Sequence, residues 1–337
     1  MTDARFEHIA VRGIAATVPQ SVVFNHEIGL PTDRTYVSEL SQKLGVHQRH
    51  KVDAQMSGSH LAAEAVRSVL NLVGWESNSI DVLILGTQTP DQLFPGNSFS
   101  LHKSLCLPKN CIVFDYGLGC SAFTHGLWII SSLLQASGRR GVLVNVDLMT
   151  RTLFSHDIGN QILFGDAATA TAIEISDDCS PLFVSLASDG TGIESVCFPN
   201  SGVSRRANEE SGFLLNGPAV LGLALREVPR LIKRVLEKAN LKVEDVDLFV
   251  PHQANAFILR KLAEAVTIPE DKLVLALEKF GNTSSASIPL ALCHSLSRVS
   301  TDEMKAVLTV GFGTGFSLSA AVVDLSQAVF GEVTTVA

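Results

Sequence analysis

The sequence lacks several features that mark particular classes of protein. Its six cysteines include no CxxC pair, so neither a disulfide framework nor a zinc site is indicated. It has no excess of basic residues: the net charge of −8 argues against a broad nucleic-acid surface. No apolar stretch is long enough to span a bilayer, and the N-terminus, MTDARFEH, lacks the basic-then-apolar order of a signal peptide. We therefore expect a cytoplasmic protein with reduced thiols and no nucleic-acid or membrane partner.

The composition is that of an ordinary globular protein with a sizeable core. Of its 337 residues, 46% are hydrophobic and 18% are charged, and this length suits two domains or two halves that share an interface. The CLPKNC segment, with Cys106 and Cys111, has no nearby histidine or second cysteine pair. We predict that both are buried thiols.

Short, continuously apolar runs recur along the chain and are typical of strands buried on both faces. They are VLILG (82–86), CIVF (111–114), VLVNV (142–146), LFV (248–250), LVLAL (273–277) and AVLTV (306–310). Amphipathic patterns at 59–75 and 219–241 predict helices between them, and Pro229 is a candidate kink in the second. Strands that alternate with helices in this way indicate an α/β fold.

Two similar offsets point to an internal duplication. SIDVLILG resembles DVDLFVPH, with Asp81 and Asp247 166 residues apart, and GVLVNV resembles KAVLTV, with Val142 and Val307 165 apart. An offset of 165 carries Cys120 onto Ser285, again in a polar turn before an apolar helix. We predict halves at 1–175 and 176–337 that pack as a pseudo-twofold pair, with a ligand site at their junction.

Cys120 stands where a Gly-rich turn meets an apolar helix, in DYGLGCSAFTHGLWIISSLL. A helix N-terminus favours the thiolate, which is the nucleophilic form of cysteine, and small neighbours let a substrate approach. A buried structural cysteine is the alternative interpretation, and it is the commoner one for a lone cysteine.

A histidine and an asparagine occupy comparable turns of the second half. His252 follows the apolar run in VDLFVPHQAN, and Asn282 lies in the Gly turn of EKFGNTSSAS. Strand-end loops build the active sites of α/β folds, and Cys, His and Asn supply a nucleophile, an imidazole and an amide donor. One histidine after a strand is more often structural, but three such residues at related turns favour a site.

These segments together resemble the β-ketoacyl-acyl-carrier-protein synthase III enzymes of the thiolase superfamily. The resemblance rests on GCSAF, LFGDAATA, VPHQAN, GNTSSASIP and GFGTGFSLSAAVV, and it runs from about residue 8 to 325. It implies a thiolase-like fold: duplicated βαβαβαββ halves in a five-layered αβαβα arrangement, normally in a homodimer.

The resemblance also implies roles. Cys120 would take an acyl group from acyl-CoA, and its N–H and that of Thr314 would form the oxyanion hole. A malonyl thioester, from malonyl-CoA or a malonyl carrier protein, would then lose CO₂ while His252 and Asn282 stabilise the enolate that attacks the acyl-cysteine. No metal or redox cofactor is needed. The further substrate-binding positions implied are Phe94, which would reach across the dimer, Lys43, Gly217 and Ala254.

The sequence departs from the family pattern at the substrate entrance. Glu39 and Ile158 stand where a Trp–Arg clamp for adenine is usual, and the last glycine loop reads GTG (313–315). Positions that usually form a basic carrier-protein patch are Phe257, Glu264–Ala265 and Gly222. Arg226, Arg230, Lys233 and Arg234 form either a replacement basic face or an ordinary solvated helix face. The tail after Leu325 extends past the usual end of the family.

Three alternatives stay open. An acyltransferase on the same scaffold would form an ester or amide from acyl-Cys120 without decarboxylation, whereas the retained Asn282 favours condensation. A cysteine hydrolase shares the order Cys, His, Asn but has a different cysteine context. A non-catalytic partner subunit would normally lack Cys120. The departures favour a specialised pathway, and acyl chain length and the extender's carrier stay undetermined.

Overall fold

The computed structural model describes residues 2–29, 34–206 and 210–337. Two sheets form its framework, and two pairs of short strands lie outside them. The seven-stranded sheet has the order β15 (Val329–Phe330), β2 (Ile9–Pro19), β8 (Asp166–Ile175), β7 (Arg140–Leu148), β5 (Val82–Gly86), β6 (Ile112–Tyr116), with β16 (Thr334–Val336) also on β2. The five-stranded sheet has the order β1 (Thr2–Phe6), β9 (Leu182–Ser188), β14 (Ser317–Val323), β13 (Val307–Gly313), β12 (Leu248–Pro251). The short pairs are β3 (Val22–Phe24) with β4 (Gln48–His50), and β10 (Val196–Cys197) with β11 (Leu214–Leu215).

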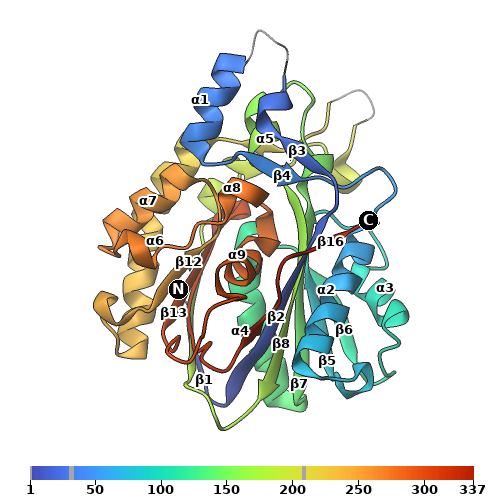
Figure 1. Cartoon of the computed structure of the whole chain (residues 1–337), viewed down its shortest axis with the longest axis vertical. Coiled ribbons are helices and arrows are strands. Elements are labelled where there is room, and N and C mark those ends of the chain that lie inside the picture. The colour runs from blue at the N-terminus through green and yellow to red at the C-terminus, as the bar shows by residue number, and fades with distance from the viewer. Residues whose placement is uncertain (1, 30–33, 207–209) are drawn as a thin grey trace.

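Helices cover both sheets and fill the space between them, which gives five layers (Figure 1). The central layer contains α4 (Ala122–Ser137) and α9 (Ser287–Leu296). The outer layers contain α2 (Gly58–Val73) and α3 (Asn97–Ser104) on one side, and α6 (Gly217–Ala239) and α7 (Ala256–Ala265) on the other. Helices α1 (Arg34–Leu44) and α5 (Ile158–Leu163) lie toward the top of Figure 1, and α8 (Leu277–Phe280) packs against β4. The predicted αβαβα arrangement is confirmed.

The duplication appears in matching hydrogen bonds. Asp81 Oδ2 accepts from the N–H groups of Arg139 and Arg140, at 2.7 and 3.0 Å. Asp247 Oδ2 accepts in the same way from Lys305 and Ala306, at 2.9 and 2.7 Å. Each aspartate thus ties the start of one central strand to its neighbour, at the positions that the sequence offset pairs.

The two sheets exchange strands from the ends of the chain. The boundary at 175/176 falls between β8 and β9, which lie in different sheets, but β1 pairs with β9 in the second sheet. The tail beyond Leu325 contributes β15 and β16, which both run parallel to β2 in the first sheet. Ala328 and Phe330 are buried, so the tail is a packed part of the fold.

One expectation about local structure is wrong. The run LVLAL is not a strand: Leu273 makes one isolated bridge to Phe249, and α8 begins at Leu277. The Gln253 side chain replaces the missing strand partner, because its amide donates to the Val274 carbonyl and its oxygen accepts from the Ala276 N–H. Pro229, the candidate kink, lies within α6, which is one helix. Among the described residues, no helix is both long and apolar enough to cross a membrane.

Candidate active site

Cys120 lies at the start of the central layer, where the predicted turn meets the predicted helix. It belongs to the short 3₁₀ helix η4 (Gly119–Ser121), which leads directly into α4. Gly119 has φ +52°, a left-handed conformation that glycine adopts without strain. Gly313 at the end of β13 packs on the cysteine so closely that a Cβ there would lie 2.7 Å from Cys120 Cβ. Glycines on both sides therefore let the thiol sit between the two halves.

The thiol of Cys120 is not ionised at rest, contrary to the sequence expectation. Burial raises its pKa to about 12, and Asp147 adds to the rise, although contact with Ser284 opposes it. Desolvation disfavours the thiolate more than its neighbours favour it. Cys120 must therefore lose its proton as it attacks. The prediction that both thiols of the CLPKNC segment are buried is confirmed for Cys111 and is wrong for Cys106, which is exposed.

His252 and Asn282 converge as predicted. His252 follows β12 and is 2% exposed, and Asn282 enters from the loop before α9. The Asn282 Nδ2 atom lies 3.5 Å from His252 Nε2. Ser287 Oγ lies 2.7 Å from His252 Nδ1, and Phe312 packs edge-on against the imidazole. When Ser287 donates to Nδ1, the Nε2 atom carries the proton and both groups are donors aimed at one place.

Ser284 links the three residues, and sequence reasoning missed it. Its N–H donates to Asn282 Oδ1 at 2.9 Å, which turns the Asn282 amide nitrogen toward His252. Its hydroxyl lies 3.9 Å from Cys120 Sγ. Ser284 has φ +50°, a strained value for a serine, and it occupies the place of Gly119 in the other half. Its position within GNTSSASIP was the available signal, but the sequence offset pointed to Ser285.

A buried carboxylate supports the same turn. Asp147, at the end of β7, is fully buried and accepts from Gln88 N–H and from the hydroxyls of Thr87 and Thr89. Its second oxygen accepts from the Ser285 N–H at 3.1 Å. Asp147 thus fixes the loop after β5 against the turn that carries Asn282. A carboxylate directly after a buried strand was the signal that could have identified it.

The neutral state of His252 predicts how stability depends on pH. Burial lowers the pKa of His252 to about 3 from its ordinary value of 6.5. Between these values the unfolded chain binds a proton that the folded chain excludes, so stability is full above pH 6.5 and falls as pH decreases. The loss should be about 1.4 kcal/mol per pH unit. Urea unfolding of wild type and His252→Gln at pH 7 and pH 5 measures it, and equal losses in the two proteins would contradict this assignment.

Thr314 lies beside Cys120, in the 3₁₀ turn η11 (Thr314–Phe316) that follows Gly313. Its hydroxyl donates to Gln88 Oε1 at 2.9 Å. Both side chains line a cavity of about 660 Å³ whose wall also includes Gly117, Met149 and Phe213. The Thr314 side chain is accommodated in this turn because Gln88 accepts its hydrogen bond.

The four other predicted substrate residues lie in different places. The Ala254 N–H donates to the His252 carbonyl at 2.8 Å, whereas the other three belong to separate parts of the chain. Phe94 is 83% exposed in the loop between β5 and α3, as expected of a residue that needs a cover. Lys43, in the last turn of α1, lies over the Phe257 ring, 5.8 Å from its centroid. Gly217 begins α6, and a Cβ there would meet no atom within 4 Å. Ala254 is buried two residues after His252.

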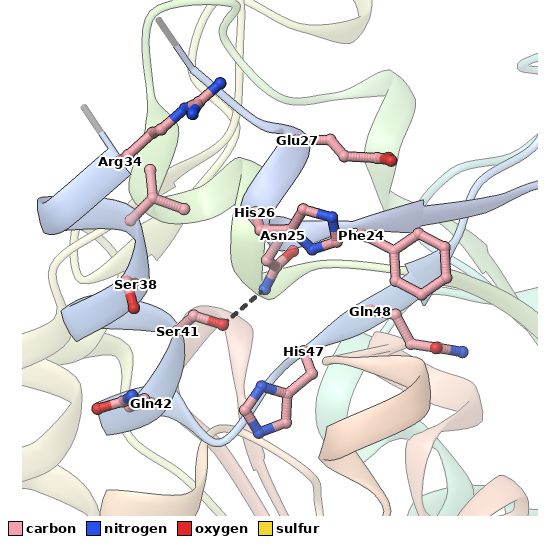
Figure 2. A pocket seen from close by; sticks show the side chains of 11 residues that line it. Phe24, Asn25, His26, Glu27, Arg34, Ser38, Ser41, Gln42, His47 and Gln48 are labelled. Atoms are coloured by element: carbon pink, nitrogen blue, oxygen red, sulfur yellow. Dashed lines mark hydrogen bonds between the residues drawn. The ribbon is translucent and has the colours of Figure 1, made fainter. Parts of the chain in front are cut away.

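A second cavity, of about 780 Å³, opens between α1, β4 and the 3₁₀ turn η1 (Asn25–Glu27) (Figure 2). Its wall includes the polar side chains of His26, Arg34 and His47. The three central residues are not part of this wall, and neither is Lys43. This cavity shares no lining residue with the 660 Å³ cavity beside Thr314.

The four side chains of the proposed replacement basic face are all engaged in ion pairs, in which they share three carboxylates. Arg226 and Arg230 both contact Glu227, at 2.6 and 3.4 Å. The other two pairs are Lys233 with Glu237 and Arg234 with Asp3. A solvated helix face, the alternative, describes these residues better. At the thinned patch, Glu264 pairs with Lys261 and Phe257 is 40% exposed.

Known proteins share both the sequence and this geometry. Models described as 3-oxoacyl-[acyl-carrier-protein] synthase III and its C-terminal part match residues 114–190 and 236–325. The β-ketoacyl-[acyl-carrier-protein] synthase III of Clostridium perfringens is 30% identical over 322 residues, which cover 93% of this chain and 98% of that protein. The chain belongs to the β-ketoacyl-[acyl-carrier-protein] synthase III family. Every motif on which the resemblance rested lies within the matched segments.

Solved structures agree with the synthase III assignment. A 3-oxoacyl-(acyl-carrier protein) synthase from Burkholderia xenovorans LB400 has a TM-score of 0.95 at 29% identity, with 99% of each chain covered. The priming β-ketosynthase of the R1128 polyketide pathway has a TM-score of 0.83 at 27% identity, with 95% of this chain and 97% of that one covered. This synthase III is therefore an acyltransferase of the condensing class with the thiolase-like fold, which excludes the cysteine-hydrolase interpretation.

Proposed function

We propose that this synthase III joins an acyl group from acyl-CoA to a malonyl thioester by decarboxylative Claisen condensation. In the first half-reaction the Cys120 sulfur attacks the thioester carbonyl, the C–S bond to CoA breaks, and the cysteine proton leaves with the CoA thiol. The N–H groups of Cys120 and Thr314 would stabilise the tetrahedral oxyanion. A neutral resting thiol suits this route, because the leaving thiolate itself accepts the proton.

The second half-reaction would use the two converging donors. The malonyl thioester carbonyl accepts from His252 Nε2–H and Asn282 Nδ2–H, CO₂ leaves, and the resulting enolate carbon attacks the acyl-cysteine carbonyl. The C–S bond to Cys120 breaks, and the thiolate takes a proton from water. The observation that carries this proposal is the 3.5 Å separation of the two donor atoms, with Ser284 fixing the amide and touching Cys120. Neither half-reaction needs a metal or redox cofactor.

Product analysis with acyl-CoA and either malonyl-CoA or a malonyl carrier protein tests the proposal. We expect a β-ketoacyl product and CO₂ from both extenders, at similar rates that vary little between about 0.05 and 0.5 M salt. The physical reason is that the basic side chains of α6 are paired with carboxylates. A strong carrier preference that disappears with salt would show that a basic docking face exists elsewhere. An ester or amide product without CO₂ would favour the acyltransferase alternative.

The proposal includes a homodimer in which Phe94 covers the partner's acyl pocket. Other apolar side chains of this half are exposed too: Leu93 at 68%, Phe99 of α3 at 55% and Ile112 of the edge strand β6 at 43%. Exposed apolar side chains support a symmetric interface that would cover them.

Phe94→Ala should therefore shift donor preference toward longer or bulkier acyl groups, because a filled part of the pocket is emptied. One methylene is worth about 1–3 kcal/mol in such a site, so the shift should be modest. Acyl-chain profiling measures it, and sedimentation of the same samples reports the dimer. An unchanged chain profile in an intact dimer would leave Phe94 a packing role only.

The cellular compartment and the pathway of the reaction are also proposals. Six free cysteines support a reducing, cytoplasmic compartment. Replacement of the adenine clamp by Glu39 and Ile158, together with the paired charges of α6, supports a specialised pathway in place of bulk fatty-acid initiation.

A further inference from the structure

Gln88 reaches the space directly above the nucleophile's turn. It follows β5 in the chain, and its side chain lies over Gly119, where a Cβ would come 2.3 Å from Gln88 Oε1 and 2.7 Å from Thr314 Oγ1. Gly119 directly precedes Cys120, so the Gln88 amide lies against the residue that leads into the nucleophile. The amide is also part of the wall of the 660 Å³ cavity.

Two polar groups of Gln88 are already used. Its backbone N–H donates to Asp147 at 2.8 Å, and its Oε1 accepts from Thr314. Within the described chain, no protein group accepts from its Nε2 amide hydrogens. The hydrogen bond to Thr314 fixes the amide, so these two hydrogens form an oriented donor in the cavity.

The remaining wall favours a ligand that brings acceptors. The Asp91 carboxylate is occupied by the N–H groups of Gly58 and Ser59. Arg151 donates to two backbone carbonyls and has no carboxylate within ion-pair distance among the described residues. Buried Met149 and Phe213 supply an apolar surface for carbon atoms. The cavity thus presents an apolar surface to a carbon chain and a hydrogen-bond donor, the Gln88 amide, to an oxygen atom.

We propose that Gln88 makes Cys120 select acyl donors that carry an oxygen substituent close to the thioester, as in 3-oxoacyl or 3-hydroxyacyl groups. This inference rests on the proposed role of Cys120 as the acyl acceptor. An unsubstituted chain that fills the cavity would leave the Gln88 amide without a partner. A site built around a hydrogen bond rejects an analogue that cannot make it.

Matched four-carbon donors test the proposal without a change in chain length. Wild type is incubated with equal concentrations of butyryl-CoA and either 3-oxobutyryl-CoA or 3-hydroxybutyryl-CoA, and intact-protein mass gives the adduct ratio on Cys120. We expect the oxygenated group to be favoured about tenfold, the effect of one well-placed hydrogen bond. In Gln88→Leu, which keeps the bulk and removes the donor, the ratio should fall to near one.

Two further variants separate the donor from general effects. Gln92→Leu changes the same residue type in the same loop, outside the cavity wall, and should keep the wild-type ratio. Thr314→Gly frees the Gln88 amide from its anchor while leaving the amide present, so the ratio should fall partway. It also guards against a Gln88→Leu protein that does not fold.

The possible results distinguish a failure of the role of Gln88 from a failure of the proposed condensation through Cys120. A wild type that takes butyryl as readily as the oxygenated donors, or a preference that survives in Gln88→Leu, overturns the role of Gln88. In both cases acylated Cys120 leaves the proposed function intact. A wild type that takes no acyl group at Cys120 from any donor overturns both.

Discussion

Cys120→Ala should abolish acyl-enzyme formation and lower turnover by several powers of ten, because covalent catalysis depends on the lost sulfur. The fold should survive, since the change removes one atom beside Gly313 and creates no buried charge. Intact-protein mass after incubation with a panel of acyl-CoAs measures the effect. In wild type, the added mass also identifies the donor that Cys120 accepts.

Cys106→Ala is the matched control for this experiment. Cys106 is an exposed thiol outside the site, so its removal should leave acylation at the wild-type level. Adducts that persist in Cys120→Ala and map to another cysteine would place the nucleophile elsewhere.

Asn282→Ala should separate the two half-reactions. The variant should still acquire an acyl group on Cys120, because the first step uses the oxyanion N–H groups and not the amide. Decarboxylation of a malonyl thioester should fall by about 10²–10³, the usual effect of removing one oxyanion donor. The measurement is CO₂ release from the malonyl thioester alongside acyl-enzyme mass in the same sample.

The neighbouring Thr283 supplies a control for Asn282. Its hydroxyl is buried and has no hydrogen-bond partner within the described chain, so Thr283→Val removes no interaction and should keep both half-reactions. Condensation that proceeds unchanged in Asn282→Ala would favour acyl transfer to a hydroxyl or amine on this scaffold.

Much of this architecture could be predicted from the sequence, because it depends on local pattern and spacing. Continuous apolar runs gave five of the six expected strands, and the offset of about 165 residues paired Asp81 with Asp247. Where an apolar run did not by itself determine the secondary structure, contacts with residues distant in the sequence determined it. LVLAL reads as a strand, but the side chain of Gln253 takes the hydrogen bonds that a neighbouring strand would make.

The central residues could be found from motifs, but their supporting contacts could not. Cys120, His252 and Asn282 each follow a recognisable turn. By contrast, Gln88 and Thr314 are 226 residues apart, and Asp147 and Ser285 are 138 apart, with no periodic pattern joining either pair. The depressed acidity of Cys120 was also missed, since a helix N-terminus is visible in sequence whereas desolvation by the opposite half is not.

The exchange of end strands bears on how this enzyme folds. The two halves make matching contacts at Asp81 and Asp247, yet β1 completes the sheet of the later half, and β15 and β16 extend the sheet of the earlier one. A gene cut at the repeat boundary would therefore yield two fragments that each carry strands belonging to the other. Although its sequence reads as two copies, the protein should unfold in a single cooperative transition and cannot be dissected into autonomous modules.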